Sequence, residues 1–284
     1  MMNRENINAE YSELLKSLSA KIFEVIEEYH KEPIKLESNL AVLIILRQIA
    51  EYIDGASVLV ANKNSDSLVP ILRTIIELSI GAEYILDNDF DTRSKKLLFY
   101  YYQKIKEQFE KSLPIKGNDV YEALQKDKYV SAETRKEFQS GSFLETEIIK
   151  KIDIILSHPS YAEIRNYYES TRKSIKHWYS ILDGPQDFVR LCQDLKKHAV
   201  YEISYRRWSS YTHGWNIVNN NIEFLDNGEF KIVGPIKEHE LSDRVLEIVS
   251  FSRSLLMCFL RKRSSPMQMQ VFGIWLEGFN NDYK

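Results

Sequence analysis

A short segment near residue 206 combines the side chains that acid–base and phosphate chemistry require. Residues 201–215 read YEISYRRWSSYTHGW. As a helix turning about 100° per residue, this segment places Arg206, Ser210 and His213 near one face. Arg207 falls on another face. An imidazole exchanges protons near neutral pH, and a guanidinium binds phosphate as a planar fork of donors. We therefore predict that His213, with Arg206 or Arg207, could cleave RNA without a metal ion, through attack of the RNA's own 2′-hydroxyl group.

A purely structural role for the same histidine is the alternative. A histidine near a helix end can be a core side chain whose ring nitrogens are satisfied by hydrogen bonds. In this interpretation His213 is buried and bonded to a carboxylate such as that of Glu77. Burial separates the two interpretations, because a sealed histidine could not reach RNA.

Two apolar segments each place an arginine four residues before a glutamate. ILRQIAEYIDGA contains Arg47 and Glu51, and ILRTIIELSIGA contains Arg73 and Glu77 at the same offsets. Duplication of a helical unit and convergence of two core helices both explain the match. Residues four apart share a helix face, and buried charges persist only when they are paired and hydrogen-bonded. Each pair is therefore either a polar staple that fixes helix packing or part of an interior site.

The second of these pairs is the stronger candidate for a role in a site, because its helix has fewer other polar residues. We predict that Arg73 and Glu77, together with Tyr205 and Ser210, form a polar network that supports the catalytic residues.

The elements that must position these side chains are mostly helices. Gly and Pro number only 10 and 7 in 284 residues, about half their usual share, which excludes an all-β fold with its frequent turns. We predict a mainly α helical bundle with a helical insertion and one small β-hairpin. After a first helix at about 8–30, the expected parts of a single helical domain over 1–284 are core helices at 36–112, an insertion or flanking subdomain at 116–174, Arg/His-bearing helices at 185–215, the β-hairpin at 222–234 and a C-terminal helix at 241–263.

Composition excludes several other classes of protein. The net charge of −3 argues against a non-specific nucleic-acid coat, and only Cys192 and Cys258 are present, which argues against a disulfide framework. The first residues are polar, and no apolar run reaches the length of about 20 residues that a membrane span needs. We therefore expect a cytoplasmic protein without a membrane partner.

The sequence contains no motif typical of metal-dependent, nucleotide-dependent or serine-nucleophile catalysis. The six histidines show no HExxH spacing, so we expect no metal site, and no glycine-rich phosphate or dinucleotide motif points to a cofactor. Ser209 and Ser210 lack the glycines of a nucleophile elbow.

Three short motifs stand out along the chain. They are RTIIE from Arg73 to Glu77, His177-Trp178 followed by a short helix, and the spacing Tyr201, Tyr205, Ser210-x-x-His213. Together they resemble a bacterial, all-helical family of unknown function, the domain-of-unknown-function family numbered five-six-seven-seven. The resemblance covers about 36–215, matches the middle insertion poorly, and implies a helical fold without supplying an activity.

More loosely, the chain resembles the HEPN superfamily of helical, usually dimeric proteins, many of which are ribonucleases of toxin–antitoxin and phage-defence systems. The arginine and histidine of that superfamily would correspond to Arg206 or Arg207 and to His213. The resemblance implies a metal-independent endoribonuclease or toxin-type effector, with RNA, a second copy of the chain and an antitoxin or defence-system protein as partners. The competing class is a non-catalytic interaction or scaffold protein in which the Arg, Glu and His side chains form a buried network.

Overall fold

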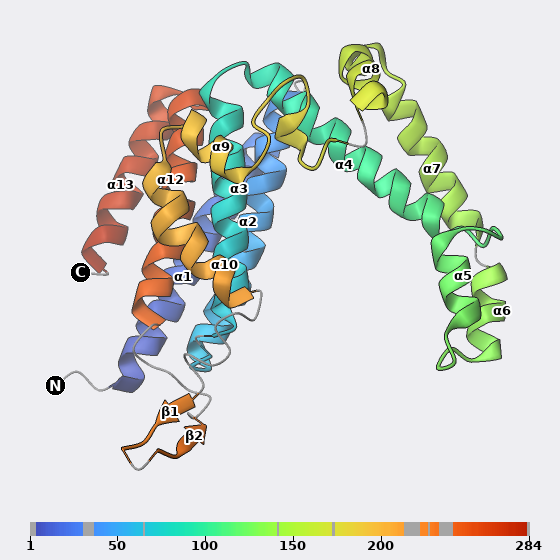
Figure 1. Cartoon of the computed structure of the whole chain (residues 1–284). Helices are drawn as coiled ribbons and strands as arrows, with labels where there is room; N and C mark the ends of the chain where they lie inside the picture. Colours follow the sequence, from blue (N-terminus) through green and yellow to red (C-terminus); the bar gives the residue numbers. More distant parts are fainter. Residues whose placement is uncertain are drawn as a thin grey trace. The chain divides into compact units, whose positions relative to one another are not determined.

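The chain is mainly helical, as the sequence predicts, with one small antiparallel sheet (Figure 1). It divides into two compact units, Met1–Asp91 together with Phe188–Lys284, and Thr92–Asp187. The structure is a computed structural model, and it describes residues 4–30, 37–64, 66–140, 142–171, 174–212, 222–226, 228–232 and 241–282.

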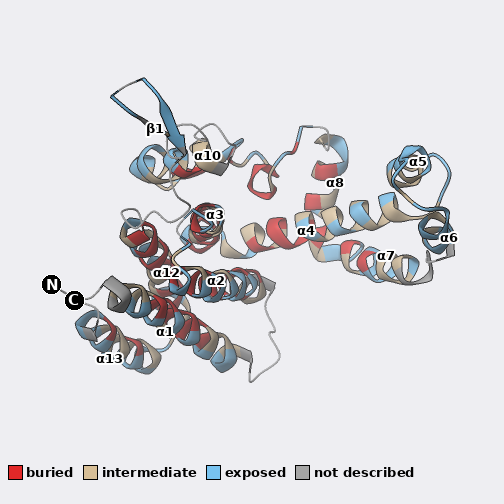
Figure 2. Cartoon of the chain, turned by 90° about the horizontal axis from the view of Figure 1, so that it is seen from below, coloured by how far each residue is buried: buried red, intermediate tan, exposed pale blue. Residues whose placement is uncertain are grey.

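The first unit is built on a ring of long helices. They are α1 (Arg4–His30), α2 (Glu37–Ala61), α3 (Leu68–Asp87) and α12 (Leu241–Arg263), and each packs against the next, with α12 returning to α1 (Figure 1). Their buried residues face a common core, as Figure 2 shows. On α1, for example, Leu15, Leu18 and Ile22 are fully buried at the three- and four-residue spacing of one helix face.

Small hydroxyl side chains fix the contact between α1 and α2. Ser12 Oγ donates to the carbonyl of Ser57 at 3.0 Å, and Ser19 Oγ donates to the carbonyl of Ala50 at 2.9 Å. Both bonds are buried. Because each hydroxyl must find a carbonyl on the other helix, the two bonds set the register of this helix pair.

Shorter elements cover α3 and α12. The helices α9 (Phe188–Asp194) and α10 (Arg206–Thr212) pack against α3, and the π-helix η3 (Val200–Tyr205) lies between them in the chain. The helix α13 (Pro266–Asp282) packs against α12. The strands β1 (Ile222–Phe224) and β2 (Phe230–Ile232) form the predicted hairpin. Among the described residues, no helix combines the length and the apolar character needed to span a membrane.

Parts of the first unit differ from the sequence prediction. Within the helices expected at 185–215, the first one described, α9, covers only Phe188–Asp194, and Lys196 has a left-handed backbone with φ of 57°. The following helix, expected as a regular α-helix, begins with the π-helical turns of η3. The sequence did not predict α13, although Pro266 stands at its first position, where proline is favoured.

The second unit is organised around α4 (Phe90–Ser112), whose first two residues belong to the first unit. The other elements of this unit are α5 (Asp119–Lys126), α6 (Ala132–Ser140), α7 (Ser142–Leu156), η1 (Pro159–Tyr161), α8 (Ala162–Thr171) and η2 (Trp178–Ser180).

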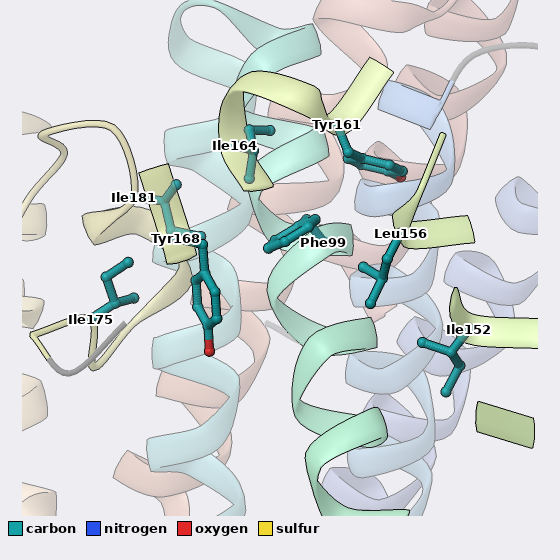
Figure 3. Close-up of a cluster of buried hydrophobic side chains, with 8 residues drawn as sticks. All are labelled: Phe99, Ile152, Leu156, Tyr161, Ile164, Tyr168, Ile175 and Ile181. Atoms are coloured by element: carbon teal, nitrogen blue, oxygen red, sulfur yellow. The ribbon is translucent and has the colours of Figure 1, made fainter. Parts of the chain in front are cut away.

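The core of the second unit is packed around the aromatic side chain of Phe99. Phe99 of α4 lies between the rings of Tyr161 and Tyr168, with centroid distances of 5.9 and 5.6 Å (Figure 3). The hydroxyl of Tyr168 donates to Glu107 at 3.2 Å. The remaining members of the cluster are Ile152, Leu156, Ile164, Ile175 and Ile181. Phe99 therefore supplies core packing in this unit.

A constrained loop follows η2, the short helix that comes directly after His177. Leu182 and Asp183 both adopt left-handed backbone conformations, with φ of 53° and 56°, which non-glycine residues rarely do. Tyr167 holds the loop, since its hydroxyl donates to Asp183 Oδ1 at 3.0 Å and accepts from the Asp183 amide. A Cβ on Gly184 would collide with the carbonyl oxygen of Tyr179, so this position requires glycine.

Candidate functional site

A polar triangle joins α3 to η3. Arg73 Nε donates to Glu77 Oε1 at 3.1 Å, and Arg73 Nη2 donates to the hydroxyl of Tyr205 at 3.0 Å. The same hydroxyl donates to Glu77 Oε1 at 2.8 Å. The structure thus brings together the side chains of Arg73, Glu77 and Tyr205, across 128 residues of sequence between Glu77 and Tyr205.

Aromatic side chains of α9 and η3 pack against the tyrosine of the triangle. The ring of Tyr205 lies 4.3 Å from that of Phe188 and 5.6 Å from that of Tyr201, and the Arg73 guanidinium lies 5.3 Å from the Tyr205 ring centroid. The π-helical turn brings Tyr201 and Tyr205 into this arrangement, with the Arg206 amide donating to the carbonyl of Tyr201 five residues back. Such π-helical turns occur frequently at functional sites.

The electrostatics of the triangle favour a neutral tyrosine between two charged groups. Burial raises the pKa of Tyr205 to about 12, and the negative charge of Glu77 adds to that shift, while Arg73 opposes it. Burial disfavours the charge of Arg73, but its interactions with Tyr205 and Glu77 outweigh that effect and raise its pKa. At neutral pH the tyrosine therefore acts as a hydrogen-bonding bridge and not as a base.

The corresponding pair on α2 has a different environment. Arg47 Nε donates to Glu51 Oε1 at 3.1 Å, but the two side chains are 69% and 55% exposed, compared with 22% and 42% for Arg73 and Glu77. Arg47 and Glu51 are therefore not part of an interior site. The sequence spacing is the same, but the pair on α3 is hydrogen-bonded to Tyr205 of η3.

A second cluster anchors α10 through a fully buried tryptophan. Trp208 Nε1 donates to Glu247 Oε2 on α12 at 2.8 Å. Arg244, also fully buried, holds its guanidinium 5.3 Å from the Trp208 ring and 5.7 Å from the Tyr211 ring. Arg244 Nη1 donates to Asp66 Oδ1 at 2.9 Å, so its charge is compensated by a carboxylate just before α3.

The sequence prediction did not include this second cluster. Arg244 stands three residues after Leu241 and four before Ile248, both of which are buried on α12. A charge on an apolar stripe is a signal of a paired buried ion, and it could have identified Arg244. Its partners Asp66 and Trp208 belong to distant segments, and no spacing rule reveals them.

The predicted catalytic arginines lie on the exposed part of α10. Arg206 Nη1 donates to Glu202 Oε2 at 3.1 Å, and its side chain is 72% exposed. The Arg207 guanidinium lies 4.4 Å from the centroid of the Trp208 ring. Ser210 Oγ donates to the carbonyl of Arg207 at 2.7 Å. His213 lies outside the described residues, so its pairing with either arginine stays a prediction.

Metal-ligand chemistry has no support in the described part of the chain, where no group of three or more His, Cys, Asp or Glu side chains could hold an ion. Burial raises the pKa of Cys192 to about 12 and also raises that of Cys258, so neither thiol is activated as a nucleophile.

Comparison with protein-family models shows which family the chain belongs to. The model of a family of unknown function (DUF5677) matches residues 39–230, which is more than half of the chain. The chain belongs to this family. No curated protein and no solved structure matches the chain.

The DUF5677 match includes the polar triangle and both exposed arginines. Residues 39–230 contain Arg73, Glu77 and Tyr205, and also the whole of α10. The helix α12, which carries Arg244 and Glu247, lies beyond the matched residues. The resemblance to this family predicted from the short motifs is confirmed, whereas the looser resemblance to the HEPN superfamily stays a prediction.

Proposed function

We propose that this DUF5677 protein is a HEPN-like, metal-independent endoribonuclease or toxin-type effector of a bacterial defence system. The observation that carries the proposal is the position of two exposed arginines, Arg206 and Arg207, on the helix that leads directly to His213. Exposed guanidinium groups can meet a phosphate without first breaking a buried contact.

The reaction needs no reactant besides the RNA, and water exchanges one proton. The 2′-oxygen attacks the adjacent phosphorus, and the bond from phosphorus to the 5′-oxygen of the next nucleotide breaks. His213 acts as general acid or base, taking the proton of the 2′-hydroxyl or supplying one to the departing 5′-oxygen, and solvent water carries the other of these two protons. An arginine stabilises the added negative charge on the phosphate oxygens. The products are a 2′,3′-cyclic phosphate and a 5′-hydroxyl.

The anchoring of α10 supports this proposal. A catalytic group must be held within a fraction of an ångström of its working position, and elements fixed by buried contacts hold it best. The contact of Trp208 with Glu247 fixes α10 to α12, and the hydrogen bonds of Tyr205 to Arg73 and Glu77 fix the end of η3 to α3. In this role the polar triangle holds the element that carries the arginines and does not take part in the reaction.

The proposal is tested with purified protein, RNA and a chelator. We expect cleavage in the presence of EDTA, cyclic phosphate ends on the products, and no cleavage where the ribose at the cleaved position is replaced by 2′-deoxyribose. The variant His213→Ala should lose cleavage, while the control His198→Ala, which changes an exposed histidine of the same unit, should retain it. Cleavage that is unchanged in His213→Ala would reject the assignment.

A non-catalytic scaffold is the second candidate, and the polar triangle favours it. The mutual hydrogen bonds of Arg73, Glu77 and Tyr205 fix one helical element against another, which is what a packing staple does. Absence of cleavage by the wild type and by His213→Ala alike, with a lower melting temperature for the variant, would support the scaffold instead of the nuclease.

A further inference from the structure

We infer that Arg207, and not Arg206, is the arginine that binds phosphate, and that Trp208 and Arg244 are the residues that position it. The inference rests on the proposed function and deepens it, because the sequence leaves the choice between the two arginines open.

The surroundings of Arg206 oppose phosphate binding. Its guanidinium donates to the Glu202 carboxylate at 3.1 Å, one turn back in the chain. A phosphate at Arg206 would therefore meet a second negative charge within a few ångströms. With the side chain 72% exposed, the ion pair leaves Arg206 largely solvated and free to change rotamer.

The surroundings of Arg207 favour phosphate binding. Its guanidinium is held 4.4 Å from the centroid of the Trp208 ring, within the range of a cation–π contact. No ion pair of Arg207 with a carboxylate is recorded among the described residues. A cation–π contact restrains a guanidinium without using its N–H donors, which stay available to phosphate oxygens.

The tryptophan that Arg207 contacts is itself held in place by buried interactions. Trp208 is fully buried, its Nε1 donates to Glu247 at 2.8 Å, and Arg244 lies 5.3 Å from the ring. Two guanidinium groups, those of Arg207 and Arg244, therefore contact one indole. Arg244 is bonded to Asp66 and has no exposed surface, so it acts through Trp208 and does not touch RNA.

The arrangement predicts different behaviour for two adjacent arginines. Preorganisation lowers the entropy lost when a side chain is immobilised on binding, so a stacked arginine binds a phosphate more tightly than a solvated one. Each phosphate neutralised on single-stranded RNA contributes about 0.7 to the slope of log affinity against log salt concentration. The slope therefore counts the arginines that contact phosphate.

The experiment measures binding of a 2′-O-methyl RNA oligonucleotide, which cannot be cleaved, at several salt concentrations. For Arg207→Ala we expect roughly tenfold weaker binding and a salt slope reduced by about 0.7. For Arg206→Ala we expect a slope within error of the wild type. Arg47→Ala serves as the control, because Arg47 also pairs with a glutamate four residues away and is similarly exposed at 69%.

Two conservative variants test the positioning role. Arg207→Lys keeps the charge but loses the planar fork, so the slope should stay unchanged while binding weakens severalfold. Trp208→Phe keeps a buried ring but weakens the cation–π contact and removes the donor to Glu247, with the same expected pattern. Arg244→Lys tests whether Arg244 holds the Trp208 ring in place, and the same pattern is expected. All measurements are made well below the melting temperature of each variant.

The outcomes separate this inference from the proposed function. A reduced slope for Arg206→Ala with an unchanged slope for Arg207→Ala would overturn the inference while leaving the nuclease intact. Loss of slope in Arg207→Ala without any cleavage by the wild type would support the inference and overturn the catalytic proposal. Binding by folded Trp208→Phe that equals the wild type would show that Trp208 serves stability alone and would remove its positioning role. A wild type that does not bind RNA would overturn both.

Discussion

Removing a single oxygen atom from the polar triangle should weaken the attachment of η3 to α3. The substitution Tyr205→Phe deletes the hydroxyl that accepts from Arg73 at 3.0 Å and donates to Glu77 at 2.8 Å, while the ring keeps its contact with Phe188 at 4.3 Å. The direct pair between Arg73 and Glu77, at 3.1 Å, is also kept. The variant therefore isolates two hydrogen bonds to charged groups.

The expected loss follows from the exposure of these groups. A hydrogen bond to a charged group contributes about 1.5–3 kcal/mol, but Glu77 is 42% exposed and can recover part of its solvation. We therefore expect a total loss of about 2 kcal/mol, below the low end of about 3 kcal/mol for two fully buried bonds of this kind. For a unit of roughly 150–250 residues this corresponds to a decrease in melting temperature of about 4–8 °C.

Scanning calorimetry of the full chain measures this decrease, with Tyr201→Phe as the matched control. The Tyr201 ring stacks on Tyr205, and no hydrogen bond of its hydroxyl is recorded among the described residues. We expect the control to remain within about 0.5 kcal/mol of the wild type. Equal melting temperatures for Tyr205→Phe and Tyr201→Phe would refute the argument that the hydroxyl bridge stabilises the fold.

The same bridge predicts a dependence on alkaline pH. A tyrosine in the unfolded chain has a pKa near 10, and burial raises the pKa of Tyr205 to about 12 in the folded protein. The contribution of the neutral hydroxyl is therefore fully present below pH 10 and is lost as the pH rises toward 12. The stability difference between wild type and Tyr205→Phe should decrease over that interval, and a difference that grows would contradict the assignment.

Three further predictions concern other parts of the chain. The substitution Gly184→Ala should destabilise the second unit severely, because the new methyl group would collide with the carbonyl of Tyr179, and limited proteolysis should show earlier cleavage there. Replacing Phe99 with alanine should cost about 3–5 kcal/mol in denaturant unfolding, whereas the half-exposed neighbour Tyr101, 49% exposed, should cost much less when it is changed to alanine. Cys192, fully buried with its pKa raised to about 12, should resist alkylation at pH 8 until the protein is denatured; rapid reaction of the native protein would contradict its burial.

Sequence reasoning succeeded where periodicity decides the structure. The mainly helical fold, the hairpin and the long helix that begins at Leu241 all follow from apolar spacing and from the few Gly and Pro residues. The ion pair of Arg73 with Glu77 also follows, because residues four apart on a helix lie side by side.

Sequence reasoning failed where segments that are distant in the chain determine what surrounds a side chain. Arg47 and Glu51 have the same spacing as Arg73 and Glu77, yet they are exposed, because a helix sequence does not state what packs on each of its faces. The apolar neighbours of Arg244 on α12 could mark it as a buried charge, but its partners Asp66 and Trp208 come from distant segments that no spacing rule reveals. The helix α13 was missed because Gly273 and Gly278 reduce its helical propensity, although packing against α12 compensates.

The π-helical turn at Val200–Tyr205 should make this part of the chain tolerant of losing one residue. A π-turn holds one more residue than an α-turn, so deletion of a single residue between positions 200 and 205 would let the segment close as a regular α-helix. The missing residue and the tighter winding offset one another, so the elements before and after the turn would keep nearly their present relative orientation. Loss of one residue inside a regular helix such as α3 would instead rotate everything after it by about 100°. Among natural or engineered variants, single-residue deletions should therefore be tolerated more often in this turn than within α3.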